Sequence, residues 1–252
     1  MYEGLKIAGL VPVFNEEHKI GSVLERIPRD VVDETIVVDD GSTDASAARV
    51  LGAGATLLPM GRTFGVGAAL RAGFTYAAAQ GHDVVVVMAG NNKDAPEEIP
   101  RLLAPIASGA ADFVQGSRWL EPQTDFGDMP KYRRIATRVH PALLSYVAGQ
   151  RITDSTNGFR ALRVEMLGDE RLDLRRASLD GYDLEPHLLL RAIALGYGVC
   201  EVPVTKRYPP KSLGQTKMRP GFDWWVILRP IVRAGLRGRG TPPRSRADGT
   251  KM

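Results

Sequence analysis

Residues 83–96, DVVVVMAGNNKDAP, constrain the fold of this chain more than any other stretch. Four consecutive valines are too few and too β-branched for a good helix, and they predict a strand buried on both faces of a sheet. Small residues, two amides, Lys93 and Asp94 follow, before Pro96 begins a helix. In an open parallel sheet, ligands bind beyond the carboxyl ends of the strands, so we expect this polar segment to lie at the functional site.

Predicted strands and helices alternate along the first half of the chain. Apolar or β-branched runs predict strands at 5–13, 35–38, 55–58, 83–88 and 112–114, and helical spacing fills the intervals between them. This order predicts an α/β fold with a mostly parallel sheet and right-handed crossovers. Later in the chain we expect helices at 132–147, 182–195 and 224–236 and a strand at 199–204.

The length of 252 residues suits one α/β domain with an appendage or two small domains, and the 44% hydrophobic content is ordinary for a soluble globular protein. We assign residues 1–220 to the domain and 221–252 to an amphipathic helix and a basic, disordered tail. The single cysteine, Cys200, excludes a disulfide framework and favours a reducing cytoplasm. The first residues do not resemble a signal peptide, and no apolar run approaches the roughly 18–20 residues that span a bilayer.

Asp39 and Asp40 end a predicted buried strand, where a carboxylate is costly unless it faces a ligand or caps backbone N–H groups. Taken alone, capping of the next helix and contact with a nucleoside are equally good interpretations. Pro12, Phe14 and Glu16 end the neighbouring strand, and the first two can wall a base. Their presence favours a nucleotide pocket at this edge of the sheet.

A glycine pair, Gly65 and Gly67, precedes a predicted helix that carries Arg71. Such a turn can bring backbone N–H groups and one cation close to a phosphate. Glycines that permit close packing of a helix on a sheet explain the pattern equally well.

Residues 154–160, DSTNGFR, combine a carboxylate, hydroxyls, an amide and a guanidinium. Asp154 can take a proton from an acceptor, and Arg160 can bind a phosphate through two hydrogen bonds. The alternative is an ordinary capping turn with a solvated arginine. Further cations near this segment favour the functional interpretation, and the candidates are Arg118, Lys131, Arg133 and Arg134.

Lys217 and Arg219 lie in a glycine-bearing loop that is followed by Pro220. A mobile lid over a diphosphate has this composition, and so has an ordinary basic surface loop.

Together these segments resemble glycosyltransferase family 2, which has the GT-A fold, and most closely its dolichyl- or polyprenyl-phosphate sugar synthase branch. The similar motifs occur in the family's order: VPVFNEE at 11–17, VVDDGSTD at 37–44, GVGAALRAGF at 65–74, PEEIPRLL at 96–103, GSR at 116–118, DSTNGFRA at 154–161, EVPV at 201–204 and GQTK at 214–217. The resemblance implies a hexosyltransferase in which an acceptor oxygen attacks the anomeric carbon and expels a nucleoside diphosphate.

The resemblance also implies roles for individual residues. The nucleoside would be held by Pro12, Phe14, Glu16, Asp39 and Asp40. The acceptor phosphate and the leaving diphosphate would be served by Arg118, the segment that includes Asp154 and Arg160, and Lys217.

The sequence departs from the family at the end of the fourth predicted strand. There the family has an Asp-x-Asp motif that holds Mg²⁺ or Mn²⁺ against the diphosphate, whereas this chain has Ala89 and Asn91, with Lys93 two positions later. Ala89 cannot bind a metal and Asn91 is a weak ligand for a hard cation, so we predict no metal ligand. Our hypothesis is that the Lys93 ammonium replaces the metal, with help from Arg71, Lys217 and Arg219. The alternative is a non-catalytic relative that binds a sugar nucleotide or a lipid phosphate.

The predicted helices at 132–147 and 224–236 mix apolar faces with arginines. Helices at a membrane surface have this pattern, and so do packed helices with one solvated face. Our first interpretation is a cytoplasmic enzyme, peripheral on the inner face of the membrane, that uses a UDP- or GDP-linked sugar and a polyprenyl phosphate. The second is a soluble transferase with a small or phosphorylated acceptor. We predict no nucleic-acid partner, and a homo-oligomer is left open.

Overall fold

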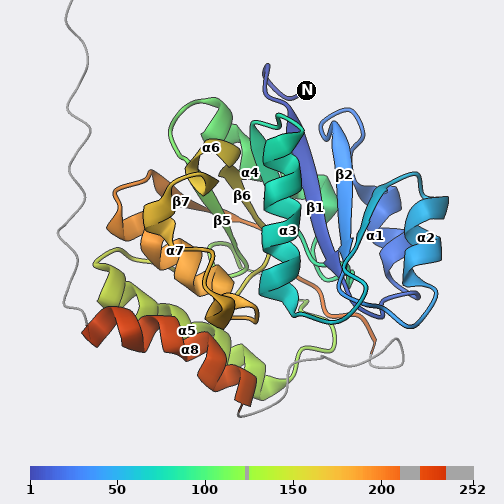
Figure 1. The fold of residues 1–252 in the computed structure, drawn as a ribbon. Coiled ribbons are helices and arrows are strands. Elements are labelled where there is room, and N and C mark those ends of the chain that lie inside the picture. The colour runs from blue at the N-terminus through green and yellow to red at the C-terminus, as the bar shows by residue number, and fades with distance from the viewer. Residues whose placement is uncertain (123–124, 211–221, 237–252) are drawn as a thin grey trace, which may run out of the picture.

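The structure is a computed structural model that describes residues 1–122, 125–210 and 222–236. It contains a seven-stranded sheet with helices on both faces (Figure 1). The strands are β1 Ile7–Val13, β2 Glu34–Asp39, β3 Thr56–Pro59, β4 Val84–Val87, β5 Phe113–Ser117, β6 Arg160–Arg163 and β7 Val199–Pro203. Their order across the sheet is β3-β2-β1-β4-β6-β5-β7.

Every neighbouring pair of strands is parallel except the pairs that involve β6. The expectation of a mostly parallel α/β sheet is therefore confirmed. The strand β6 lies between β4 and β5 and runs antiparallel to both. Because of this reversal, its amino end meets the carboxyl ends of the parallel strands, and residues 154–159 arrive at the edge where a ligand is expected.

The sequence analysis did not predict β6. The strand has four residues and an arginine at each end, so it lacks the apolar run that marked the other strands. Its burial depends on partners for these arginines, which only the folded chain supplies.

The larger helices are α1 Ile20–Arg26, α2 Ser46–Gly52, α3 Val66–Ala79, α4 Ile99–Ala107, α5 Lys131–Ala148, α7 Leu184–Ala194 and α8 Phe222–Leu236. A short α6, Val164–Leu167, and single 3₁₀ turns at Pro96–Glu98, Glu170–Leu172 and Ala177–Leu179 complete the set. The predicted helices are present with boundaries shifted by a few residues, as expected for helix ends that fray.

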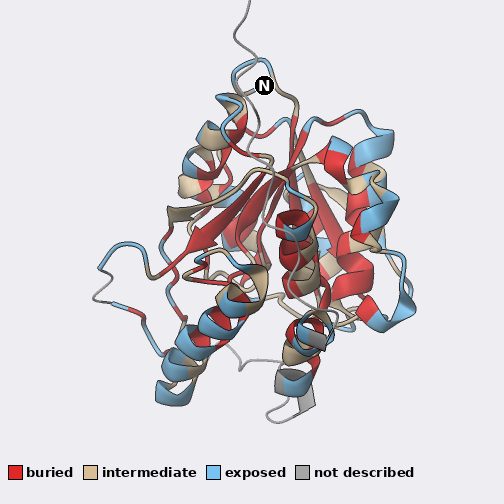
Figure 2. Ribbon diagram, turned by 90° about the vertical axis from the view of Figure 1, so that its left-hand side faces the viewer, coloured by how far each residue is buried: buried red, intermediate tan, exposed pale blue. Residues whose placement is uncertain are grey.

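Alternate residues of the strands enter two separate cores. Leu10, Ile36 and Val85 pack with α3, α5 and α7 on one face. Val11 and Val86 pack with α1, α2 and α4 on the other. Side chains of a strand alternate between faces, so the four valines of β4 supply both cores and all of them are buried. Figure 2 shows the buried sheet between helices whose outer faces are exposed.

The helix α8 contacts both α5 and α7. Figure 1 shows α5 and α8 side by side, next to the carboxyl edge of the sheet. Within the described residues, no helix has the length and apolarity needed to cross a bilayer. The tail predicted to be disordered and the boundary assigned at 220 and 221 fall on segments outside the described residues, so the domain division remains a prediction.

The first turn of α3 packs against the backbone of residues 179–181. The N–H groups of Gly67 and Ala68 donate to the Asp180 carbonyl at 2.8 and 3.2 Å. A Cβ atom on Gly67 would lie 2.1 Å from the Leu179 carbonyl oxygen. The glycine therefore permits a close approach between a helix and a loop.

We expect Gly67→Ala to lower the free energy of unfolding by about 1–3 kcal/mol, because the added methyl group must displace backbone. Gly21→Ala is the matched control, since a Cβ there meets nothing within 4 Å and alanine favours helix. Urea denaturation of the two variants measures the difference. Equal stability of the two variants would contradict this account of the α3 start.

Candidate active site

A cavity of about 910 Å³ opens at the carboxyl edge of the sheet. The ends of β1 and β4 form one wall, and α5, the 154–158 segment and the residues after β7 form another. The predicted site residues that line it are Pro12, Phe14, Glu16, Asp40, Ala89, Asn91, Lys93 and Arg118. The fold thus brings these predicted residues into one cavity from four separate stretches of the chain.

The two aspartates at the end of β2 have different surroundings. Asp39 accepts a hydrogen bond from the Ser42 N–H at 2.9 Å and does not line the cavity. Asp40 lines the cavity while its carboxylate accepts from the N–H groups of Phe64 and Gly65 at 2.7 and 2.9 Å. Asp39 therefore caps a turn and not the next helix, because α2 begins after Ala45 and has no side-chain cap. Asp40 is the one of the pair that is placed to meet a ligand.

Gly65 and Arg71 are placed differently from the phosphate site expected for them. The N–H groups of the first turn of α3 are bonded to Asp180, and the Arg71 guanidinium pairs with the Asp180 carboxylate and donates to the Leu179 carbonyl at 3.0 Å. Neither Gly65 nor Arg71 lines the cavity. Their donors serve the packing of α3, so we leave both residues out of the proposed site.

The polar segment after β4 is held in place by a buried ion pair. The Asp94 carboxylate is buried, accepts from the Ala89 N–H at 3.3 Å and forms an ion pair with Lys206. The Lys206 ammonium also donates to the Asn157 side-chain oxygen at 2.8 Å. Asp94 is therefore already paired. The residues of this segment that line the cavity are Ala89, Gly90, Asn91 and Lys93.

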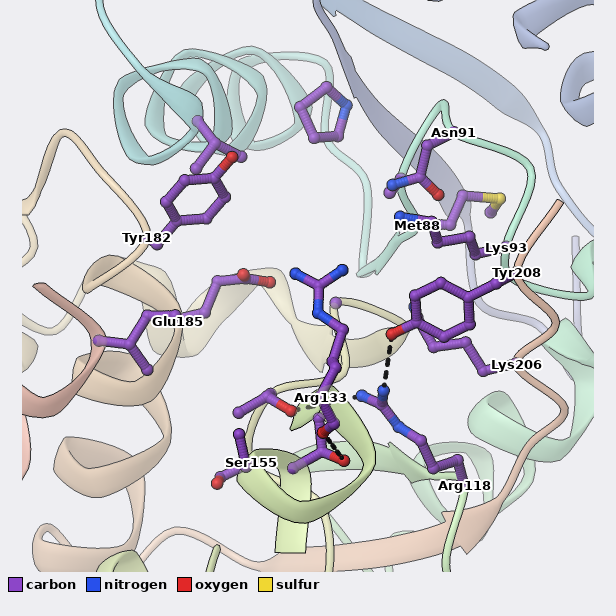
Figure 3. A pocket seen from close by; sticks show the side chains of 18 of the residues that line it. Met88, Asn91, Lys93, Arg118, Arg133, Ser155, Tyr182, Glu185, Lys206 and Tyr208 are labelled. Carbon is purple, nitrogen blue, oxygen red and sulfur yellow. Dashed lines mark hydrogen bonds between the residues drawn. The ribbon is translucent and has the colours of Figure 1, made fainter. Parts of the chain in front are cut away.

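Several cations surround the ring of Tyr208. The Lys93 ammonium lies 4.9 Å from the ring centroid and the Arg133 guanidinium 5.7 Å from it. Arg118 donates to the Tyr208 hydroxyl at 3.3 Å. Figure 3 shows Arg133 reaching into the middle of the cavity, with Glu185 on one side and Lys93 and Tyr208 on the other.

Burial and the positive charges of Arg133 and Lys206 lower the pKa of Lys93 to about 7, against the weaker opposing effects of Asp94 and Glu16. Among the described residues, Lys93 has no carboxylate within ion-pair distance. The cavity therefore holds a lysine whose charge is costly until an anion arrives.

Asp154 is fully buried and paired with Arg118, whose Nε donates to it at 2.6 Å. Its backbone N–H donates to Glu201 at 2.9 Å, and burial raises the pKa of the Glu201 carboxyl. Asp154 does not line the cavity. Its position suits the orientation of Arg118 better than the expected removal of a proton from an acceptor.

Arg160, expected to bind a phosphate, is buried at the start of β6. It donates to the Asn157 carbonyl at 2.6 Å and pairs with Glu185 at 2.9 Å. It does not line the cavity, whereas Ser155, Thr156 and Gly158 of the same segment do. Arg160 therefore braces the segment rather than facing a ligand.

The sequence analysis missed Lys206, Tyr208 and Glu185 as lining residues, and it did not place Arg133 and Lys93 at the same aromatic ring. The sequence signal for Lys206 and Tyr208 was the short basic and aromatic run KRYPP after a predicted strand, and this run matches no motif that indicates a site. Lys217 and Arg219, predicted as a lid, lie outside the described residues.

The far end of the cavity is apolar. It is formed by Ile135, Val139 and Leu143 of α5 with Ile227 and Leu228 of α8. The three α5 side chains are 66%, 52% and 46% exposed. One cavity therefore passes from carboxylates and cations at the sheet edge to an apolar surface on two helices.

The residues at the end of β4 do not fit a divalent metal ion. Mg²⁺ and Mn²⁺ require an approximately octahedral set of oxygen ligands. The segment offers one neutral acceptor, the buried Asn91 Oδ1, which has no hydrogen-bond partner. No metal-binding group of His, Cys, Asp and Glu side chains occurs in the described part of the chain. Lys93 and Lys206 would also repel a metal ion here.

Comparison with solved structures defines the fold class. A glucosyl-3-phosphoglycerate synthase from Mycobacterium tuberculosis, determined with Mn²⁺ and UDP-glucose, has a TM-score of 0.66 and 25% identity. The match covers 96% of this chain and 81% of that one. The same enzyme determined with Mn²⁺, UDP and glucosyl-3-phosphoglycerate has a TM-score of 0.67 at 23% identity. The chain thus has the GT-A-like fold of enzymes that handle nucleotide sugars, as expected.

Sequence comparison identifies the family. The profile described as Glycosyl transferase family 2 matches residues 10–170. The chain is 32% identical to polyprenol monophosphomannose synthase of Mycolicibacterium smegmatis, over 91% of this chain and 87% of that protein. It is 30% identical to undecaprenyl-phosphate mannosyltransferase of Micrococcus luteus, over 96% and 99%. The chain belongs to glycosyl transferase family 2, and the expectation of a glycosyltransferase is confirmed.

We expect Asp154→Asn to lower the free energy of unfolding by about 3–5 kcal/mol, because it leaves the buried Arg118 charge without its counterion. Asp125→Asn is the matched control. It removes the partner of Arg207 in a pair whose side chains are 70% and 60% exposed, and we expect it to cost less than about 1 kcal/mol. Urea denaturation distinguishes the two variants. A small effect of Asp154→Asn would contradict the positioning role.

A second prediction concerns pH. The charged and titratable groups that face Lys93 are Glu16, Asp94, Arg133, Lys206 and Tyr208. The pKa of Lys93 is about 7, so its ammonium is lost as pH rises above that value, and an anion then binds an amine that must first take up a proton. As pH rises above 7, we expect the Kd of inorganic pyrophosphate for the unmodified protein to rise relative to its Kd for the Lys93→Arg variant. The ratio should grow by up to about tenfold per pH unit, because the arginine guanidinium stays charged. Calorimetric titrations across this pH range measure the ratio, and a ratio independent of pH would contradict the prediction.

Proposed function

We propose that this chain transfers a sugar from a nucleoside diphosphate sugar to a polyprenyl phosphate. The observation that carries the proposal is the single cavity that joins Asp40 and Glu16, the cations around Tyr208, and the apolar side chains of α5 and α8. The names of the relatives from Mycolicibacterium and Micrococcus support the same acceptor class.

The donor would occupy the end of the cavity at β1 and β2. Pro12 and Phe14 offer apolar surface to a base, and Asp40 offers carboxylate oxygens to base N–H or ribose hydroxyl groups. Its hydrogen bonds from two backbone N–H groups fix this carboxylate in place before any ligand binds. The base is a uracil or a guanine in this proposal, as the UDP- and GDP-linked donors of our sequence interpretation imply.

The acceptor would enter from the opposite end, with its isoprenoid chain along Ile135, Val139 and Leu143. Its phosphate would meet Arg118 and Arg133, since a guanidinium can bind a phosphate through two parallel hydrogen bonds. Arg118 is held for this role by Asp154 and by the Tyr208 hydroxyl.

In the reaction, an oxygen of the acceptor phosphate forms a bond to the anomeric carbon. The bond from that carbon to the diphosphate oxygen breaks, and the diphosphate leaves with the electron pair. A phosphate monoester loses its second proton with a pKa of about 6, so the attacking oxygen carries no proton that a base must remove. This chemistry agrees with the burial of Asp154 away from the cavity.

The two helices would also hold the enzyme at a membrane surface. Trp225 of α8 and Tyr132 of α5 are 56% and 45% exposed, and α5 also carries the exposed Arg134 and Arg138. Apolar and aromatic side chains beside cations suit the interface of an anionic bilayer. A cytoplasmic, peripheral location on the inner membrane face is part of this proposal.

The test is transfer from a panel of UDP- and GDP-sugars to a polyprenyl phosphate in detergent or in anionic liposomes. We expect Val139→Ser to reduce kcat/KM for a long-chain polyprenyl phosphate by about tenfold or more, because a buried apolar contact of this size is worth about 1–3 kcal/mol. Donor binding should be unchanged.

Val232→Ser on α8 is the matched control, since this valine is 43% exposed and does not line the cavity. Equal losses in the two variants would argue against an isoprenoid path through the cavity. If transfer occurs only to water-soluble phosphorylated acceptors, the acceptor is a small molecule and the proposed polyprenyl phosphate is wrong.

A further inference from the structure

We propose that Lys93 and Arg133 take the place of a divalent metal ion, so that this chain binds and releases a nucleoside diphosphate without metal. The inference rests on the proposed function for the identity of the ligand. It differs from the hypothesis drawn from the sequence alone, in which Lys93 acted with Arg71, Lys217 and Arg219.

The charges around the cavity support this assignment. Several cations of the lining have carboxylate partners, since Lys206 pairs with Asp94, Arg118 with Asp154 and Lys19 with Glu16. Lys93 has no such partner among the described residues, and the Arg133 guanidinium lies over the same Tyr208 ring.

Protonated Lys93 and Arg133 together carry the two positive charges of a divalent ion. Lys93 belongs to the segment that holds the metal-binding motif in the family, and Arg133 approaches it from α5.

The position of Lys93 is built into the fold. Its carbonyl accepts a hydrogen bond from the Arg207 N–H at 2.9 Å, and Asp94 and Lys206 form an isolated β-bridge beside it. The loop after β4 and the segment after β7 are therefore tied through backbone as well as through the buried ion pair. A lysine on a segment held in this way is preorganised toward the cavity, as stabilisation of a charged leaving group requires.

The arrangement is costly without an anion. Two cations within reach of one phenol ring repel each other, and their partial burial weakens the screening by water. A diphosphate would offset that cost by accepting charge-assisted hydrogen bonds from both groups. When the anomeric C–O bond breaks, the departing diphosphate gains one negative charge beside donors that need not move.

The first experiment compares the full-length protein in excess EDTA with the same protein in Mg²⁺ or Mn²⁺. Calorimetry measures binding of UDP and of GDP, and a transfer assay uses the donor that the panel identifies. We expect the Kd and the transfer rate to change by less than about threefold between conditions, since no step requires the ion. Binding and transfer that occur with Mn²⁺ and vanish in EDTA would overturn the inference while leaving the proposed function intact.

Variants then test whether metal-independent transfer depends on the Lys93 side chain. We expect Lys93→Met to reduce transfer by about 100-fold or more in EDTA, the scale of removing one preorganised donor from a developing charge, and added metal should not restore it. Lys93→Arg should retain most of the activity. Lys6→Met is the matched control. Lys6 lies just before β1, at the edge of the sheet opposite the cavity, and its ammonium donates to the Gln80 carbonyl. Thermal unfolding checks that each variant is folded.

The triple variant Ala89→Asp, Asn91→Asp, Lys93→Gln restores a carboxylate pair. We expect it to bind UDP or GDP more tightly with Mn²⁺ than in EDTA, whereas the unmodified protein shows no such difference. If the triple variant gains no metal dependence, or if Lys93→Met binds the nucleotides as well as the unmodified protein, the inference is wrong. Absence of nucleotide binding and of transfer under every condition would instead overturn the proposed function.

Discussion

The buried ion pair between Asp94 and Lys206 fixes the geometry on which the cavity depends. It joins a residue just beyond β4 to one just beyond β7, at positions 112 residues apart in the sequence. Lys206 extends the connection to Asn157, and so to the segment that precedes the antiparallel strand β6. Three segments from distant parts of the chain are thereby held at one edge of the sheet. Because neither charge is left unpaired, the desolvation cost of burying them is offset at least in part.

This arrangement explains why the antiparallel strand matters for the site. A sheet made only of parallel strands would present strand ends and the loops that follow them at this edge. The reversal of β6 instead brings the residues before a strand to the same edge, so Ser155, Thr156 and Gly158 line the cavity. Arg160 stabilises the reversal from inside the sheet through Asn157 and Glu185. The arginine that seemed suited to a phosphate is thus used to position the segment beside it.

Much of the fold and part of the site could be predicted from the sequence, for reasons that particular residues make clear. The valines of β4 and the apolar spacing of α5 are local signals, and these signals predicted both elements correctly. Asp40 was found because it directly follows β2, and Lys93 because it lies in the short polar segment after β4. The strand β6 was missed because its burial depends on Asn157 and Glu185 as partners of Arg160. The contact of Lys93 with Tyr208 was missed because topology alone brings them together.

The distribution of cations is consistent with a site that must hold two anions at once. A sugar nucleotide and a lipid phosphate both bring negative charge to the reaction centre, and their mutual repulsion opposes the approach of the attacking oxygen. A single metal ion on the donor would leave the acceptor phosphate to be neutralised separately. Here Arg133 lies over the same Tyr208 ring as Lys93, and Arg118 binds the hydroxyl of that ring. Tyr208 therefore links the cation nearest the donor segment to those proposed for the acceptor, and a guanidinium shared between the two phosphates would lower the repulsion that the reaction has to overcome.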